Sequence, residues 1–399
     1  MNVLVVSHLY PYPGHERRLF VHEQNRALKE RGVRLTVVSP TGMTPRPLQV
    51  SERLVRRGQT PKEAVLDGIP VWYPRAPILP RRLLLSRSGD LFFLAVRRRL
   101  ERLRGQRFDL VHAHQALPDG ACAQRLAAAL GMPYVVTVHG RDVNYHLPHG
   151  GAVARRTSAA LAGAAAVIGV SRAVTRRLAP YVAAEKLHTI NNGVIGAGRQ
   201  VPPADTLPGA TLLLSVGNLI PSKGHHTVLE ALAQLTQARS DLQYAIVGEG
   251  VERRALAAHA RRLGIAELVH FLGYLPHERA LGVMARADLF VLPSSPEGFG
   301  LVYVEAMSQG TPVIACEGEG PEDFIRHGEN GYLVPRGDAA TLARVVAEAL
   351  ADDERRARLG AAGRATVTDL TWSRNAELTE RLYAQIAPRP GANSAKGAM

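Results

Sequence analysis

The sequence predicts an α/β protein made of two doubly wound domains, and three observations lead to that prediction. The chain has 399 residues, which is enough for two domains with large cores. Short apolar segments alternate with helical patterns along both halves, as is typical of mostly parallel sheets covered by helices on both faces. A break rich in glycine and proline at 191–203 separates the halves, and we expect it to link the domains.

The first predicted domain covers 1–195. No G-x-G-x-x-G follows its first strand, which argues against an NAD-dependent reductase or epimerase. Between about Pro45 and Gly105 the alternation loosens into a segment rich in proline and arginine. The predicted strands are Val3–Ser7, Val33–Ser39, Asp109–His114, Tyr134–His139, Ala165–Val170 and Leu187–Asn191, with helices at Glu16–Arg31 and Asp119–Leu130.

A basic stretch from Pro80 to Arg104 places apolar and arginine side chains at near-helical spacing. One interpretation is an interfacial helix that lies on anionic lipid. The other is a domain helix with an apolar core face and a solvated arginine face. The sequence is compatible with both interpretations.

The second predicted domain covers 204–370, and a further helix is predicted at 371–387. The tail at 388–399 is small and polar, so we expect it to be disordered. The predicted strands are Thr211–Val216, Gln243–Val247, Val269–Leu272, Leu289–Pro293, Pro312–Ala315 and Tyr332–Val334.

Composition indicates a cytoplasmic protein. No apolar run reaches the roughly 18–20 residues that span a bilayer, and the N-terminus lacks the basic region of a signal peptide. Cys122 and Cys316 are the two cysteines, which suits a reducing compartment.

The positive charge is confined to the first half of the chain. Residues 1–200 hold 30 lysines and arginines against 12 acidic residues, a net charge of +18, whereas 201–399 hold 19 against 23, a net charge of −4. Such a surface attracts an anionic acceptor, anionic lipid or nucleic acid. Because no RRM, KH or helix-turn-helix pattern accompanies the charge, we do not expect nucleic acid as a partner.

The most informative stretch runs from Leu289 to Glu317. It predicts a buried strand, a loop, a helix at about Gly300–Gln309 and a second strand at Thr311–Cys316. Such a unit is parallel, and its loop opens at the carboxyl end of a strand, where doubly wound sheets bind ligands. Glu297 and Glu305 flank that loop.

The residues between these two glutamates favour an anionic ligand. Main-chain amides of Phe299, Gly300 and Leu301 open the helix, and Gly298 and Gly300 permit close approach. Carboxylates accept hydrogen bonds from paired hydroxyls. Two carboxylates around an anion site therefore suggest a nucleotide sugar.

The segment EGFGLVYVEAMSQGTPVIA, with Glu297 and Glu305 eight residues apart, resembles the signature of group 1 (GT4-like) retaining glycosyltransferases of the GT-B fold. The alternative is an ordinary βαβ unit with solvated glutamates, which the long match makes less favoured. The resemblance implies two Rossmann-like domains that face each other across a cleft. It also implies that the helix at 371–387 returns to pack on the first domain, and it assigns Glu305 to the ribose and Glu297 to the transferred sugar.

Further donor-binding residues follow from the same resemblance. Lys223 follows a strand-to-helix turn and matches a lysine that holds the diphosphate. Asn218 stands where the family commonly has arginine, so it keeps a donor and lacks the charge. The backbone at Gly273 is expected to meet the base, and Gly14 is the nearest match to the backbone that approaches the phosphate.

Three histidines end predicted strands of the first domain. In the family a histidine like His139 lies near the transferred sugar, and we interpret His112 and His114 as lining the acceptor side. No carboxylate or cysteine is spaced to complete a metal site with them. We therefore expect a metal not to be required, and we expect no cofactor beyond the nucleotide sugar itself.

These observations predict a glycosyltransferase that moves a sugar from a nucleotide diphosphate to a hydroxyl with retention, in cell-surface polysaccharide or glycolipid biosynthesis. Its expected acceptor is a saccharide or a lipid-linked sugar, and the protein is expected in the cytoplasm or peripherally on the inner face of the plasma membrane. One alternative is a non-catalytic protein that binds nucleotide sugars on the same shell. Another is a GT-B epimerase or phosphorylase, because a fold hosts several chemistries.

Overall fold

The computed structural model describes residues 1–13, 19–43, 60–77, 84–99, 103–194, 200–204, 207 and 211–387. The chain forms two compact units, one of Met1–Gly193 with the chain from Trp372 onward, the other of Val194–Thr371. Gly14, the tail predicted to be disordered, and parts of the predicted linker and of the basic Pro80–Arg104 stretch lie outside the described residues.

The first unit contains an eight-stranded sheet in the order β10-β9-β8-β7-β1-β2-β5-β4. Its strands are parallel except at the edge, where β4 runs antiparallel to β5. The order reverses between β1 and β7, which makes the carboxyl ends of these strands a place for ligands. The strands are β1 (Asn2–Val6), β2 (Arg34–Val38), β4 (Glu63–Leu66), β5 (Ile69–Trp72), β7 (Leu110–His114), β8 (Tyr134–Val138), β9 (Ala166–Gly169) and β10 (Leu187–Thr189).

The segment in which the sequence pattern loosens contributes two strands to this sheet. β4 and β5 form a hairpin joined by Asp67 and Gly68, whose φ angles are 47° and 69°. Two successive positive φ angles are typical of a two-residue hairpin turn, and Asp-Gly is a strong sequence signal for it. The same segment also provides helix α3 (Ser88–Arg97) and strand β6 (Arg75–Pro77), which pairs in parallel with β3 (Thr41–Met43) just before the segment.

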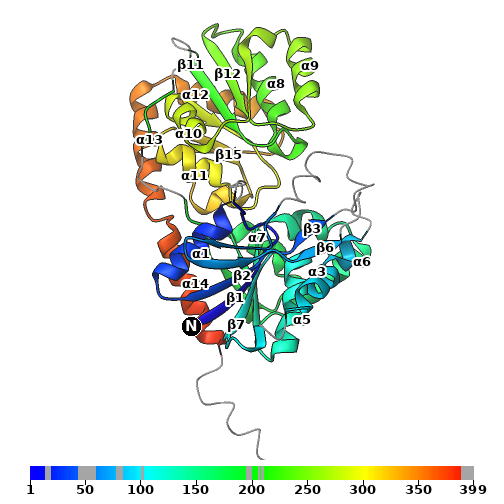
Figure 1. Cartoon of the computed structure of the whole chain (residues 1–399). Helices are drawn as coiled ribbons and strands as arrows, with labels where there is room; N and C mark the ends of the chain where they lie inside the picture. The colour runs from blue at the N-terminus through cyan, green and yellow to red at the C-terminus, as the bar shows by residue number, and fades with distance from the viewer. Residues whose placement is uncertain are drawn as a thin grey trace, which may run out of the picture. The chain divides into compact units, whose positions relative to one another are not determined.

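The last helix, α14 (Trp372–Ile386), packs against α1 (Phe20–Glu30) in the first unit (Figure 1). Gln24 Nε2 donates to Asn375 Oδ1 at 2.7 Å, and Arg31 pairs with Glu380 at 2.6 Å. The chain thus returns to its first unit, as the resemblance implies. The other helices of this unit are α5 (Ala121–Leu130), α6 (Gly151–Ala162) and α7 (Arg172–Leu178).

The second unit contains a six-stranded parallel sheet in the order β13-β12-β11-β14-β15-β16. Its order reverses between β11 and β14, so this unit is also doubly wound. Its strands are β11 (Thr211–Val216), β12 (Leu242–Val247), β13 (Val269–Gly273), β14 (Leu289–Val291), β15 (Val313–Cys316) and β16 (Tyr332–Val334). Its helices are α8 (His225–Leu235), α9 (Arg253–Arg262), α10 (His277–Arg286), α11 (Leu301–Ser308), α12 (Ala339–Leu350) and α13 (Asp353–Val367).

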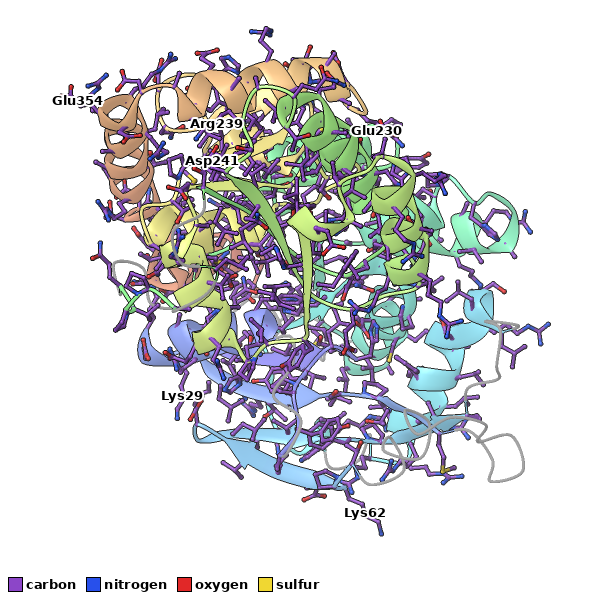
Figure 2. All side chains as sticks on the ribbon, turned by 90° about the horizontal axis from the view of Figure 1, so that it is seen from above. Lys29, Lys62, Glu230, Arg239, Asp241 and Glu354 are labelled. Carbon is purple, nitrogen blue, oxygen red and sulfur yellow. The ribbon has the colours of Figure 1, made fainter. Side chains whose placement is uncertain are left out.

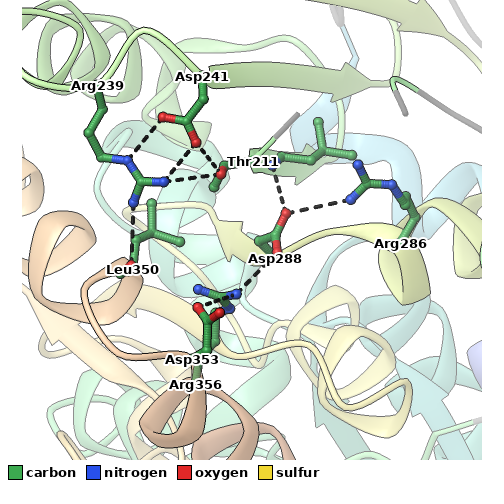
Figure 3. A network of polar contacts seen from close by, with 9 residues as sticks. Thr211, Arg239, Asp241, Arg286, Asp288, Leu350, Asp353 and Arg356 are labelled. Carbon is green, nitrogen blue, oxygen red and sulfur yellow. Dashed lines mark hydrogen bonds and ion pairs between the residues drawn. The ribbon is translucent and has the colours of Figure 1, made fainter. Parts of the chain in front are cut away.

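A polar network joins the amino ends of three of these strands (Figure 3). Asp241, just before β12, accepts from Arg239 at 2.7 Å and from Thr211 Oγ1 at 2.5 Å. Asp288, just before β14, accepts from the amide of Leu212 at 2.8 Å. The hydrogen bond from Arg239 holds the pKa of Asp241 below its usual value. The network stabilises the amino ends of these strands. The candidate site residues lie at the opposite, carboxyl ends.

Charged side chains of both signs surround the two units (Figure 2). The labelled side chains are Lys29 and Lys62 in the first unit and Glu230, Arg239, Asp241 and Glu354 in the second. In the described part of the chain, no helix is both long and apolar enough to cross a membrane.

Candidate functional site

Two predicted site residues meet at the point where the strand order of the second unit reverses. Lys223 ends a short 3-10 turn in the loop after β11, and Glu297 lies in the loop after β14. The ammonium Nζ of Lys223 lies 2.6 Å from Oε2 of Glu297, with the side chains 19% and 14% exposed. Because β11 and β14 are parallel neighbours, both loops leave the same edge of the sheet.

The carboxylate of Glu297 is held by neighbours from its own loop as well. Ser294 Oγ lies 3.1 Å from Oε2, and the amide of Gly298 donates to Oε1 at 3.1 Å. Both carboxylate oxygens therefore have donors. An ordinary solvated glutamate, which was the alternative from the sequence, makes no such set of contacts.

The start of α11 depends on Gly300. Its φ angle is +89°, and a side chain there would bring a Cβ within 2.5 Å of the Tyr303 ring. Tyr303 is fully buried and donates to the carbonyl of Leu292 at the end of β14. Glycine at 300 thus lets the chain turn sharply from the Glu297 loop into the helix. Phe299 is buried against Phe324, with ring centroids 5.2 Å apart, and Leu301 is the first helical residue.

Glu305 lies on α11, and its side chain is 19% exposed. His277, the first residue of α10, brings Nε2 to 3.2 Å from Oε1 of Glu305. The carboxylate therefore has a partner of its own, separate from those of Glu297.

Asn218 and Gly273 also lie at carboxyl ends of strands. Asn218 is exposed in the loop after β11, close in sequence to Lys223. Gly273 ends β13 with a φ of +69°, and its carbonyl accepts from the amide of Gly248 at 2.7 Å. Gly14 is not among the described residues, so its predicted role is not tested.

In the first unit, His139 directly follows β8. Its Nε2 lies 3.1 Å from Nδ1 of His114, and the two rings stack at 5.4 Å with an angle of 15°. The ring of Phe20 also packs against the imidazole of His139, with ring centroids 4.8 Å apart. His139 is thus held in one orientation by a histidine and a phenylalanine.

His112 and His114 are both internal residues, which corrects the prediction that they line the acceptor side. His112 is fully buried, with Nε2 2.8 Å from Thr137 Oγ1 and Nδ1 2.5 Å from the hydroxyl of Tyr383 on α14. The sequence alone does not distinguish a core histidine from one at a strand end. The hydrogen-bond partner that shows His112 to be internal is Tyr383, which lies on the returning helix, 271 residues away.

Burial keeps all three histidines neutral. It lowers the pKa of His112 to about 3 and that of His139 to about 4, and it holds the pKa of His114 well below its ordinary value. At neutral pH these rings are therefore hydrogen-bonding groups rather than cations. Among the described residues, no cluster of three or more His, Cys, Asp or Glu side chains is arranged to hold a metal ion.

The sequence interpretation missed three side chains that contact the site residues. Ser294 contacts Glu297, His277 contacts Glu305, and Glu319 accepts from the main-chain amide of Glu297 at 2.8 Å. The sequence has an acidic, glycine-rich segment at Glu317–Glu322, which by itself is compatible with a loop near the sugar and with a solvated surface. Burial of Glu319 at 4% exposure shows that this residue is not solvated.

Two protein-family models match the chain. The model described as "Glycosyl transferases group 1" matches residues 204–366, and the model described as "Glycosyltransferase Family 4" matches residues 19–195. Together they cover the larger part of both units.

Individual proteins agree with these models. The chain is 30% identical to a glycogen synthase of Mycobacterium tuberculosis (strain CDC 1551 / Oshkosh), over 96% of this chain and 94% of that protein. It is 36% identical to the lipopolysaccharide core biosynthesis glycosyltransferase LpsE of Rhizobium meliloti (strain 1021), over 49% of this chain and 56% of that protein. Among solved structures, HepE of Anabaena in complex with UDP and glucose superposes with a TM-score of 0.74 at 22% identity, over 96% of this chain and 100% of that one.

Proposed function

Because the chain belongs to the group 1, family 4 glycosyltransferases, which have the GT-B fold, we propose that it transfers a sugar from a nucleotide diphosphate to a hydroxyl acceptor with retention of configuration. The observation that carries the proposal is the contact of Lys223 with Glu297 where the strand order reverses. A cation and a carboxylate at this point match a ligand with a diphosphate beside a sugar.

We assign the donor to the second unit, residue by residue. Lys223 and the amides around Gly298, Phe299, Gly300 and Leu301 bind the diphosphate. Glu297 accepts from hydroxyls of the transferred sugar. We assign Glu305 to the ribose and the backbone at Gly273 to the base. Asn218 is assigned a hydrogen bond without charge to the diphosphate.

The chemistry follows from where charge develops. As the glycosidic bond breaks, negative charge grows on the leaving diphosphate, where Lys223 and the start of α11 stabilise it. The acceptor hydroxyl attacks from the face that the diphosphate leaves, and a phosphate oxygen takes its proton. The neutral imidazole of His139 is suited to a hydrogen bond with a sugar hydroxyl and not to binding the diphosphate charge. No step requires a metal, so activity is expected to survive EDTA.

For the acceptor we propose a saccharide or lipid-linked sugar of a cell-surface polysaccharide or glycolipid. The similarity to LpsE supports this class, and the UDP complex of HepE makes UDP the first nucleotide to test. The first 200 residues carry a net charge of +18, which suits an anionic acceptor or an anionic membrane surface.

A thermal-shift measurement tests the donor site. UDP, GDP, ADP and their sugars are each added to wild type, to Glu305→Ala and to Glu354→Ala, a matched control on the exposed face of α13. We expect one nucleotide to raise the Tm of wild type and of the control but not of Glu305→Ala, because a ligand stabilises the state that binds it. If no nucleotide raises any Tm, the donor assignment is wrong.

Product analysis separates transfer from the rival chemistries. NMR of the product is expected to show the same anomeric configuration as the donor sugar. An epimerase would not attach the sugar to an acceptor. A phosphorylase would be active only with added orthophosphate. A non-catalytic binding protein would pass the thermal-shift test and give no product.

Vesicle pelleting tests the membrane proposal. Arg97 and Arg98 are exposed near the end of α3, where Leu94 is 47% exposed. We expect binding to anionic but not to neutral vesicles, weakened at high salt and by Arg97→Glu with Arg98→Glu. The control pair Arg261→Glu and Arg262→Glu, on α9 of the second unit, is expected to bind like wild type. Absence of binding at any salt would refute association with anionic lipid.

A further inference from the structure

The carboxylate of Glu319 connects two loops of the second unit. Glu319 lies in the loop after β15 and is 4% exposed. Its Oε1 accepts from Ser295 Oγ at 2.7 Å, and its Oε2 accepts from the main-chain amide of Glu297 at 2.8 Å. Both donors belong to the loop after β14. One buried carboxylate thus binds the backbone and a side chain of the neighbouring loop.

A second contact from the loop after β15 involves the main-chain carbonyl of Glu297. The amide of Gly320 donates to the carbonyl of Glu297 at 3.2 Å. A Cβ at Gly320 would lie 2.3 Å from the carbonyl oxygen of Gly298, so the two main chains touch and only glycine fits. The loop after β15 therefore holds both the N–H and the C=O of Glu297.

Other groups hold the Glu297 side chain. Its carboxylate receives Lys223 Nζ at 2.6 Å, and Ser294 Oγ lies 3.1 Å away. Those contacts involve groups that we assign to donor binding, whereas Glu319 contacts the main-chain amide of Glu297 and the hydroxyl of Ser295. The orientation of Glu297 therefore has a support that does not change when Lys223 turns to a phosphate.

We propose that Glu319 is a positioning residue that holds the backbone of Glu297 so that its carboxylate is directed at the transferred sugar. This inference rests on the proposed function of Glu297. Hydrogen bonds to a carboxylate are stronger than those between neutral groups, and a displacement of about 1 Å at a reacting centre costs about a hundredfold in rate. Precise support from residues that do not touch the substrate is what such a site requires.

The test compares Glu319→Gln with Glu317→Gln, a matched control in the same loop whose side chain is exposed. Glu319→Gln keeps the size of the side chain but removes its charge and leaves one acceptor oxygen. The new NH₂ group can only donate, and the hydrogen bond from the Glu297 amide loses its charge assistance. Hydrogen exchange of the Glu297 amide is expected to accelerate at least tenfold in Glu319→Gln and to stay unchanged in Glu317→Gln.

Steady-state kinetics distinguishes a positioning role from a general loss of stability. In Glu319→Gln we expect kcat to fall about tenfold or more while the KM for the donor changes less than threefold, because the phosphate and ribose contacts stay in place. Ser295→Ala, which keeps the bond from Glu297 to Glu319, is expected to have a smaller effect on kcat. If Glu319→Gln does not fold, Ser295→Ala removes one of the two donors that hold the Glu319 carboxylate, and the expected result is a smaller fall in kcat with an unchanged KM for the donor; an unchanged kcat would then count against the positioning role.

The outcomes separate this inference from the proposed function. Equal amide exchange in Glu319→Gln and Glu317→Gln would overturn the positioning role, and so would equal kcat. If wild type transfers no sugar, the proposed function fails, and the amide exchange then decides alone whether Glu319 holds Glu297.

Discussion

Lys223 and Glu297 are 74 residues apart in sequence, and their charged atoms lie 2.6 Å apart. We assign this cation to the diphosphate and this carboxylate to the transferred sugar. Under the proposed function, a bound donor replaces the contact, since the ammonium cannot give its full charge to both. The assignment therefore predicts that binding of the phosphate releases the carboxylate toward the sugar.

The first prediction concerns this pair. Lys223→Met is expected to lower kcat by about 10²–10³, because it removes a cation from the developing negative charge. It should also lower stability by about 1–2 kcal/mol, since Glu297 loses its partner while it is largely shielded from water. Activity assays and urea denaturation measure the two effects.

Two controls accompany that variant. Lys62→Met changes an exposed lysine of the first unit and is expected to change neither quantity. In the double variant Lys223→Met with Glu297→Gln, stability should recover in part because no carboxylate is left unpaired. Additive losses of stability would contradict the coupling.

The second prediction concerns Asn218, where the family commonly has arginine. Asn218→Arg is expected to lower the KM for the donor about threefold to tenfold, because a charge-assisted hydrogen bond to phosphate is stronger than a neutral one. The improvement should shrink as salt increases. Asn218→Gln, which adds length without charge, should leave KM near that of wild type. A KM for Asn218→Arg equal to that of Asn218→Gln would place this residue away from the diphosphate.

The third prediction concerns pH. Burial lowers the pKa of His112 to about 3 and that of His139 to about 4, against about 6.5 in the unfolded chain. Below pH 6.5 the unfolded state therefore binds more protons than the folded state, and stability decreases as pH falls. Each buried histidine contributes a slope of up to about 1.4 kcal/mol per pH unit between 6.5 and its folded pKa.

Urea denaturation of the whole chain between pH 7.5 and 4.5 measures this slope. His112→Asn should reduce it, because one buried titrating group is gone. His149→Gln, which replaces an exposed histidine, should leave it unchanged. A stability that is flat over this range would mean that the three rings protonate freely in the folded protein.

The fourth prediction concerns the contact of the returning helix with the first sheet. Tyr383→Phe removes the hydroxyl that lies 2.5 Å from His112 Nδ1 and leaves a buried nitrogen without that partner. A loss of about 1–2 kcal/mol in unfolding free energy is expected, measured with urea at pH 7.5. Tyr181→Phe, at a tyrosine that is 38% exposed, is the control and should cost less than about 0.5 kcal/mol. Equal losses would show that the buried hydroxyl contributes nothing specific.

Local pattern was sufficient for most of the strands. The structure confirms Thr211–Val216 and Tyr332–Val334 at both ends, since each is a compact, largely apolar run with glycine or proline close to both ends. The hairpin around Asp67 and Gly68 was missed although its turn signal is present, because the flanking strands have four residues each and sit in a proline- and arginine-rich segment.

The candidate site was predictable as far as its residues lie in one continuous stretch. Glu297, Gly300 and Glu305 share the loop and helix after β14, so their proximity follows from local structure. The bond from Glu297 to Glu319 joins loops 22 residues apart, and the partner of His112 lies on the last helix. Such contacts depend on how strands and helices are arranged in space, which spacing along the chain does not reveal.

The return of α14 to the first unit has a consequence for how the protein is made. The first 193 residues leave the ribosome long before Trp372 is translated. The last helix of the first unit is therefore made only after the whole second unit. Until then α1 and the buried His112 lack the side chains of Asn375 and Tyr383 that contact them. The N-terminal unit therefore cannot be completed until the second unit has been translated.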